Sequence, residues 1–197
     1  MLKIALGTSN PHKLEEINDM IQEIHPDSVE FVLVEGEFDP IENGTTFEEN
    51  SYIKAAEAAK IMGIPALADD TGLCVDALDG RPGIYSARYA PDQKSKISKL
   101  LDEMKDVEQK NRKAHFVCTM TLVTPNGEKL FSNTGRIYGY IDTKPSGEHG
   151  FGYDPLFFIP DLNKTMAEMT LKEKNTLSHR ARALRPMMEW IKSNLAD

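Results

Sequence analysis

Two adjacent carboxylates, Asp69 and Asp70, interrupt an apolar stretch in ALADDTGLCVDAL, residues 66–78. Neighbouring residues of a strand face opposite sides, so both carboxylates reach one site only where the strand ends and the chain turns. Thr71 and Gly72 offer a place for that turn. Two close carboxylates repel each other unless a cation lies beside them, and Mg²⁺ suits them because it prefers oxygen ligands. The alternative is a polar turn with an Asx cap, which is the commoner use of such a run.

A second candidate site is the segment TSNPHK, residues 8–13, whose hydroxyls and lysine suit phosphate oxygens. Residues 3–7 predict a strand, and the apolar spacing of residues 9–24 predicts a helix. Asn10 is a natural N-cap and Pro11 a natural first helical residue. The segment therefore lies where free N–H groups can receive an anion. An ordinary capped helix start is the alternative, and the absence of a P-loop pattern argues against a Walker-type NTPase.

A third candidate is GFGYDP, residues 150–155, where glycines let the backbone approach a ligand closely. Phe151 could stack on a base, although packing in a turn is the commoner use of such an aromatic residue. Asp154 precedes a proline and could equally be a turn residue. The motif is informative only in combination with the others.

Basic side chains gather in LKEKNTLSHRARALR, residues 171–185, at the start of a final helix predicted over 176–195. Cations at a helix N-terminus oppose the macrodipole, so an external anion or acceptor would stabilise them there. For the two later arginines a solvated helix face is the better interpretation. The residues that we assign to ligand binding are Lys174, His179 and Arg180.

Length and composition limit the classes of function. The 197 residues suit one domain, or two lobes of one, and the formal net charge of −8 disfavours binding to long nucleic acid. The first ten residues are too short an apolar run for a signal peptide, and no stretch approaches the roughly 20 apolar residues of a membrane span. We therefore expect a cytoplasmic protein. Cys74 and Cys118 are expected to be buried thiols without a disulfide.

The remaining pattern predicts a mixed sheet with helices around it. Thr46 and Glu49 have the spacing of a capping box, which starts a helix that ends before Gly63. The turn PNG joins two strands into a β-hairpin. The further predicted elements are a strand at 65–70, a helix at 95–104, strands at 114–124, 128–133 and 135–141, and an apolar segment at 156–160.

Four segments, TSNPHK, ADDTG, GFGYDP and EKNTLSHR, stand in this order and together closely resemble the inosine/xanthosine triphosphate pyrophosphatase family. The similarity extends from Lys3 to the final helix and includes NGTTFEENSYIKA and RPGIYSARYA. Each motif alone is weak, but four in order at fitting distances are specific. The resemblance implies enzymes that hydrolyse non-standard purine nucleoside triphosphates.

The resemblance also implies an architecture. It predicts an elongated α/β fold with a mixed central sheet flanked by helices, and two lobes with an active-site cleft between them. One pyrophosphatase domain would span residues 1–197, usually as a homodimer. With Mg²⁺ as cofactor, such an enzyme converts XTP, ITP or dITP to the monophosphate and pyrophosphate.

Residue roles follow from the resemblance by position. Asp70 would be the general base and, with Glu42, the metal ligand. From the residues alone, either Asp69 or Asp70 could activate the water, and the family favours Asp70. The substrate-binding residues would be Thr8, Ser9, Asn10 and Lys13 at the triphosphate, Thr71 beside the substrate, and Phe151, Gly152, Tyr153, Asp154, Lys174, Ser178, His179 and Arg180 at the base.

Two positions depart from the family pattern: Thr71 replaces a frequent serine, and His149 replaces a frequent glycine. Base selectivity has a physical rationale, because Lys174 and Arg180 are only donors and suit the 6-oxo group of hypoxanthine or xanthine. One alternative is a Maf-like nucleotide pyrophosphatase of other specificity, which would carry a serine- and arginine-rich first loop. The other is a non-catalytic purine nucleotide sensor, for which so many carboxylates near a triphosphate would be unfavourable.

Overall fold

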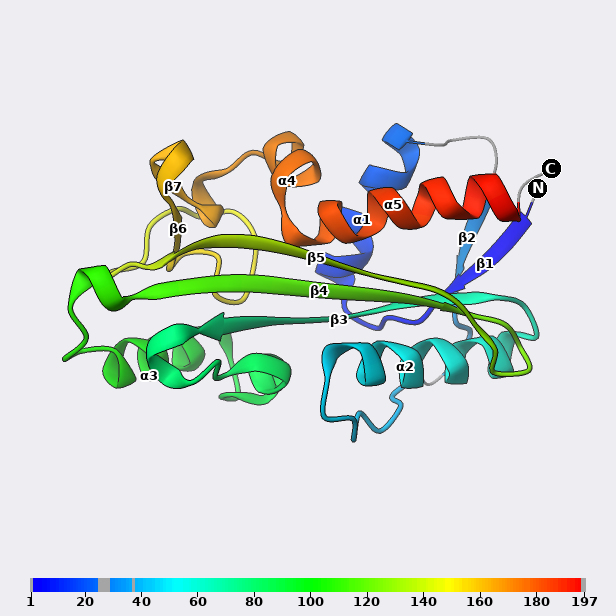
Figure 1. Cartoon of the computed structure of the whole chain (residues 1–197), viewed down its shortest axis with the longest axis horizontal. Helices are drawn as coiled ribbons and strands as arrows, with labels where there is room; N and C mark the ends of the chain where they lie inside the picture. Colours follow the sequence, from blue (N-terminus) through cyan, green and yellow to red (C-terminus); the bar gives the residue numbers. More distant parts are fainter. Residues whose placement is uncertain (1, 25–28, 37, 196–197) are drawn as a thin grey trace. The chain divides into compact units, whose positions relative to one another are not determined.

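A seven-stranded mixed β-sheet is the framework of the computed structural model, which describes residues 2–24, 29–36 and 38–195 (Figure 1). The strands are β1 (Leu2–Leu6), β2 (Val29–Leu33), β3 (Ala66–Val75), β4 (Lys113–Val123), β5 (Lys129–Ile141), β6 (Phe157–Ile159) and β7 (Lys164–Thr165). Their order is β2-β1-β3-β4-β5-β6-β7, with β1 parallel to β2 and β3, and β6 antiparallel to β5 and β7. The predicted mixed sheet is confirmed.

Helices flank this sheet, as predicted. They are α1 (Pro11–Ile24), α2 (Phe47–Met62), α3 (Gln93–Glu103), α4 (Leu171–Leu177) and α5 (His179–Asn194). Short 3-10 helices lie at Asp76–Leu78, Gly83–Arg88, Gln109–Asn111, Pro160–Leu162 and Met166–Glu168. Within the described ranges, no helix has both the length and the apolar character that crossing a membrane requires.

The course of β3 corrects the prediction of a turn at Thr71-Gly72. The strand continues without interruption from Ala66 to Val75 and includes both aspartates. Its later residues Leu73 and Val75 are fully buried, so the burial of apolar side chains favours an extended strand over a turn. Because side chains alternate along a strand, Asp69 and Asp70 face opposite sides of the sheet.

Three other predictions need correction. The expected strands at 128–133 and 135–141 form the single strand β5, and Gly135 within it has no room for a side chain, because a Cβ would lie 2.1 Å from the His179 carbonyl oxygen. The expected final helix is split into α4 and α5 at Ser178, whose backbone is extended (φ −66°, ψ 161°). The short strand β2 was not predicted.

The two cysteines are free thiols, as expected. Only Cys118 is buried, however, whereas Cys74 is half-buried.

The chain forms two compact units, which we describe separately. Unit 1 comprises the described residues of Met1–Asp70, Cys118–Gly135 and His179–Asp197. In its largest apolar cluster α1 and α5 pack together through side chains such as Ile17, Met20, Leu184 and Met188.

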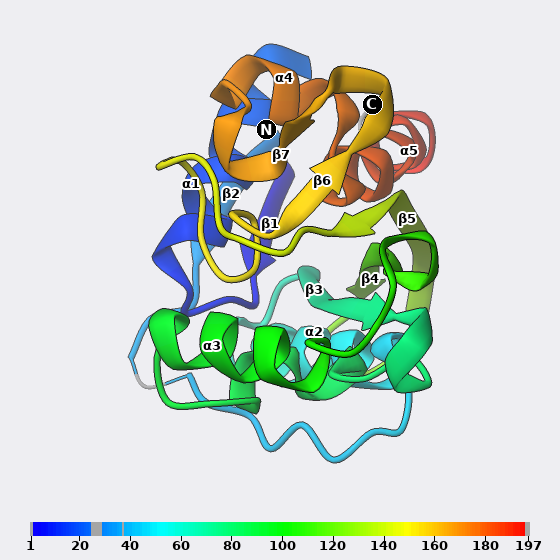
Figure 2. The same ribbon diagram turned by 90° about the vertical axis from the view of Figure 1, so that its left-hand side faces the viewer.

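Unit 2 comprises Thr71–Val117 and Arg136–Ser178. Its core joins α3 to the outer parts of β3, β4 and β5, with the rings of Phe116 and Phe157 4.8 Å apart between centroids. Figure 2 shows α4 beside β6 and β7 in this unit. Each unit therefore has an apolar core of its own, and the single two-lobed domain stays a prediction.

Candidate active site

The start of α1 places Lys13 in the first helical turn of unit 1. The Asn10 side-chain oxygen accepts hydrogen bonds from the backbone N–H groups of His12 at 3.0 Å and Lys13 at 3.4 Å, which confirms Asn10 as the N-cap. The Thr8 hydroxyl oxygen accepts the Asn10 N–H at 3.2 Å. Ser9 is exposed between them. The loop therefore presents its polar groups beside a capped helix start.

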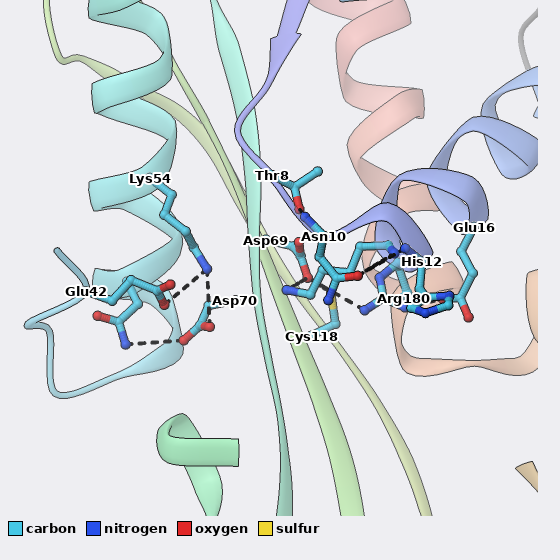
Figure 3. Close-up of polar contacts among 12 residues, drawn as sticks. Thr8, Asn10, His12, Glu16, Glu42, Lys54, Asp69, Asp70, Cys118 and Arg180 are labelled. Atoms are coloured by element: carbon cyan, nitrogen blue, oxygen red, sulfur yellow. Dashed lines mark hydrogen bonds and ion pairs between the residues drawn. The ribbon is translucent and has the colours of Figure 1, made fainter. Parts of the chain in front are cut away.

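Asp69 faces α1 and α5 and lies in a polar group with residues of both helices (Figure 3). Its Oδ2 is 2.9 Å from Lys13 Nζ and 3.8 Å from Arg180 Nη2, and the Cys118 thiol lies 3.8 Å from the same oxygen. The carboxyl side chain is 1 % exposed. Two cations from different helices therefore compensate this buried charge.

Arg180, expected at the base pocket, is buried in unit 1 and pairs with Glu16 of α1. Burial acts to lower the pKa of Arg180, but the charges of Glu16 and Asp69 outweigh it and raise that pKa above its ordinary value. The neighbouring His179 is buried as well. Glu16 was not identified from the sequence, because it lies on α1 as an ordinary acidic residue with no motif around it.

Asp70 faces α2 on the other side of β3 and lies in a second polar group (Figure 3). The Lys54 ammonium is 3.4 Å from Asp70 Oδ1 and 3.1 Å from Glu42 Oε2, so it lies between the two predicted metal ligands. Burial raises the pKa of Asp70, while Lys54 and Lys13 act in the opposite direction. The structure thus brings Glu42 and Asp70 together around one cation.

Asn50 of α2 ties this group to the segment that carries Glu42. Its amide nitrogen donates to Asp70 Oδ2 at 3.3 Å, and its side-chain oxygen accepts the Gly44 N–H at 2.9 Å. A Cβ at Gly44 would lie 2.7 Å from that oxygen, so glycine permits the close approach. The helix itself begins with the predicted capping box of Thr46 and Glu49.

Asn50 and Lys54 were not predicted, because the apolar stripe of helix α2 made its polar residues look like a solvated face. Its buried face contains Asn50, Ser51 and Lys54 together with three alanines. The signal that would have identified them is the i, i+4 spacing of polar residues on the same side as buried alanines. Buried polar groups need partners, so a polar core face on a helix indicates a site.

Glu42 and Asp70 are the residues of this group that could hold a divalent metal ion. Within the described ranges, no three or more His, Cys, Asp and Glu side chains lie together as metal ligands. Hard divalent cations such as Mg²⁺ are commonly bound through one or two carboxylates, and water or phosphate oxygens complete the coordination. The ammonium of Lys54 shows that the two carboxylates can share one positive charge.

Unit 2 brings together three residues expected at the base. Lys174 Nζ donates to Asp154 Oδ2 at 2.8 Å and lies 5.7 Å from the centre of the Phe151 ring. The Phe151 N–H donates to the same aspartate oxygen at 3.1 Å. Gly150 has φ +78°, and a Cβ there would lie 2.1 Å from that oxygen, so only glycine fits.

The other predicted residues of unit 2 have different environments. The Tyr153 side chain is 4 % exposed and its hydroxyl donates to the Ser86 carbonyl oxygen at 3.0 Å. Ser178 is buried, and its N–H donates to the Lys174 carbonyl at the end of α4. Thr71 is half-buried on β3, and Gly152 is half-buried in the glycine-rich loop.

Known proteins resemble this chain along almost its whole length. Residues 4–190 match the model of the Ham1 family. The dITP/XTP pyrophosphatase of Clostridium perfringens is 44 % identical, with 99 % of this chain and 100 % of that protein covered. The dITP/XTP pyrophosphatase of Bacillus subtilis is 41 % identical, with 98 % of both chains covered.

Solved structures agree. A HAM1 protein from Coxiella burnetii has a TM-score of 0.86 at 36 % identity, covering 98 % of this chain and 100 % of that one. The Staphylococcus aureus Ham1 protein has a TM-score of 0.84 at 38 % identity, covering 97 % and 98 %. The resemblance seen in the four motifs is confirmed, and the chain belongs to the Ham1 family.

Proposed function

We propose that this protein hydrolyses the non-standard purine nucleotides XTP, ITP and dITP to the monophosphate and pyrophosphate, and so cleanses the nucleotide pool. The observation that carries the proposal is the group of Glu42, Lys54 and Asp70, two carboxylates that share one cation. It occurs in a chain that resembles dITP/XTP pyrophosphatases from end to end. The enzyme is thus a hydrolase of an acid anhydride bond.

Asp70 is the proposed general base. Its carboxylate is buried on β3 beside Glu42 and Lys54, which places a proton acceptor among the groups proposed to bind the metal ion and the triphosphate. The water oxygen forms a bond to the α-phosphorus, and the bond from that phosphorus to the bridging oxygen breaks. Pyrophosphate leaves with the electron pair, and the proton passes to Asp70. Asp69 is the weaker candidate because Lys13 lies 2.9 Å from its Oδ2.

Glu42 and Asp70 would hold Mg²⁺, the proposed cofactor. When bound, the ion supplies positive charge that neutralises the triphosphate. Lys13 and Lys54 supply ammonium groups in unit 1 for phosphate oxygens, and the loop with Thr8, Ser9 and Asn10 adds hydroxyls and N–H groups. These contacts stabilise the charge that accumulates on the leaving group.

The groups proposed to recognise the base are Phe151 for stacking and Lys174 for hydrogen bonding. An ammonium group is only a donor, so it matches the 6-oxo group of hypoxanthine or xanthine and mismatches the 6-amino group of adenine. Asp154 orients Lys174 through the 2.8 Å contact. The remaining residues proposed at the substrate are Thr71, Gly152, Ser178, His179 and Arg180, whereas the buried Tyr153 is proposed to act through the loop that carries Phe151 and Asp154.

Three further properties belong to the proposal. We expect a homodimer, a cytoplasmic location, and small nucleotides rather than nucleic-acid polymers as partners. The net charge of −8 supports the last of these. A Maf-like enzyme and a non-catalytic sensor remain the alternatives that an assay must separate.

The test is the release of pyrophosphate from ITP, XTP, ATP, GTP and dTTP, each with and without Mg²⁺. We expect rapid Mg²⁺-dependent release from ITP and XTP and little from ATP. Little release from GTP is expected as well, but because guanine shares the 6-oxo group, it requires a pocket that leaves the 2-amino group unpaired or clashing. Tight ITP binding without any release would favour the sensor instead. Preferential hydrolysis of dTTP would favour the Maf-like alternative.

A further inference from the structure

The Tyr153 side chain connects the glycine-rich loop to another segment of unit 2. Its ring is buried in the core of that unit, 6.3 Å from the Tyr89 ring between centroids. Its hydroxyl donates to the Ser86 carbonyl oxygen at 3.0 Å. Burial and the Tyr89 hydroxyl raise the pKa of Tyr153, so the group stays a neutral donor. A side chain in this position is poorly placed to contact a nucleotide directly.

Ser86 belongs to a segment that is itself firmly held. Its hydroxyl oxygen accepts the Leu73 N–H of β3 at 2.9 Å, and the same hydroxyl donates to the Gly83 carbonyl at 2.6 Å. The residues that flank the segment are held by Glu103 of α3, which accepts hydrogen bonds from Tyr89 at 2.7 Å and Arg81 at 2.8 Å. The acceptor that Tyr153 uses therefore lies in a segment that several hydrogen bonds connect to β3 and α3.

The loop that Tyr153 holds needs such a support. Gly150 and Gly152 both have positive φ, at +78° and +63°, and glycine loses more conformational freedom on ordering than any other residue. Phe151 and Asp154, the proposed base-binding residues, lie on either side of Tyr153 in the chain. Fixing Tyr153 restricts both residues, because Asp154 follows it directly in the chain and Phe151 is separated from it only by Gly152.

We propose that Tyr153 is a positioning residue, whose hydroxyl holds residues 150–154 on the Ser86 support and keeps Phe151 and Asp154 in the conformation that accepts a purine base. This inference rests on the proposed function. If the loop adopts the base-binding conformation in only a fraction of the molecules, the apparent affinity for the nucleotide is reduced by that fraction. The chemical step relies on Asp70 of unit 1, so loss of the tether raises KM and leaves kcat unchanged.

The experiment compares wild type with Tyr153→Phe, which removes only the hydroxyl. It measures kcat and KM for ITP, the inhibition constant of inorganic tripolyphosphate, and hydrogen–deuterium exchange over residues 147–155. We expect KM to rise about fivefold, as loss of one buried hydrogen bond implies. The kcat is expected to stay unchanged. The inhibition constant of tripolyphosphate is also expected to stay unchanged, because tripolyphosphate has no base. Amide exchange in the loop should become faster.

Tyr52→Phe is the matched control. It removes a tyrosine hydroxyl that donates to a backbone carbonyl, that of Gly127 at 2.9 Å, within unit 1, so it reports the general cost of such a loss away from the loop. We expect its KM for ITP and its loop exchange to equal those of wild type. The proposal is overturned if Tyr153→Phe behaves like this control, or if the tripolyphosphate constant rises together with KM. If wild type releases no pyrophosphate from ITP, the proposed function fails, and loop exchange alone then decides whether the tether exists.

Discussion

Asp69 and Asp70 are neighbours in the chain, yet they occupy two different electrostatic environments. On one side of β3, Asp69 and Glu16 face Lys13 and Arg180, two anions with two cations. On the other side, Asp70 and Glu42 share Lys54, two anions with one cation. Counting these ion pairs, the first group has as many cations as anions and the second has one cation fewer, while the charge of Lys13 also acts on Asp70.

Under the proposed function, the two aspartates of β3 have different roles. Removing one partner from the buried group around Asp69 would leave an uncompensated buried charge. A group with excess negative charge can receive a further cation, such as a metal ion that accompanies a triphosphate. This difference supports the proposal that Asp70 is the general base and that Asp69 positions Lys13 and Arg180.

The largest expected effect is on turnover. Asp70→Asn removes the proposed proton acceptor and one metal ligand, so kcat for ITP should fall about a thousandfold. Asp69→Asn keeps the proton acceptor, so it should retain much more of the turnover of wild type. The measurement is pyrophosphate release under saturating ITP and Mg²⁺. If Asp70→Asn keeps full hydrolysis while Asp69→Asn abolishes it, the two roles are reversed.

In stability the order of the two variants should be reversed, with the larger loss in Asp69→Asn. Asp69→Asn leaves Lys13 and Arg180 beside a neutral group, so the free energy of unfolding should fall by about 3 kcal/mol. Asp70→Asn should cost much less, because Glu42 still pairs with Lys54. Urea unfolding followed by circular dichroism measures both. Equal losses of unfolding free energy in the two variants would contradict the difference in charge balance between the two groups.

The smallest expected effect is stabilisation by the metal ion. Mg²⁺ at ten times its dissociation constant should stabilise the wild type by about 1.4 kcal/mol, and EDTA should reverse this. The shift in Tm should disappear in Asp70→Asn and Glu42→Gln and persist in Asp69→Asn. A shift that depends on Asp69 instead would place the ion on the other side of β3.

Much of the fold could be predicted from local sequence. The N-cap at Asn10, the capping box of α2 and the mixed sheet all follow from local hydrogen bonding and from the spacing of apolar residues. The continuation of β3 through Thr71 and Gly72 could not be predicted, because these two residues locally favour a turn. Burial of Leu73 and Val75 overrides that preference.

The candidate site shows the same division. The sequence by itself determined the family, the types of chemical groups and the reaction that they suit, because these depend on residue identity and order. Only the tertiary structure decided that Asp69 and Asp70 serve different groups, that Lys54 joins Glu42 to Asp70, and that Tyr153 points into the core. The physical reason is that charge balance and burial depend on partners distant in the chain, which folding alone brings together.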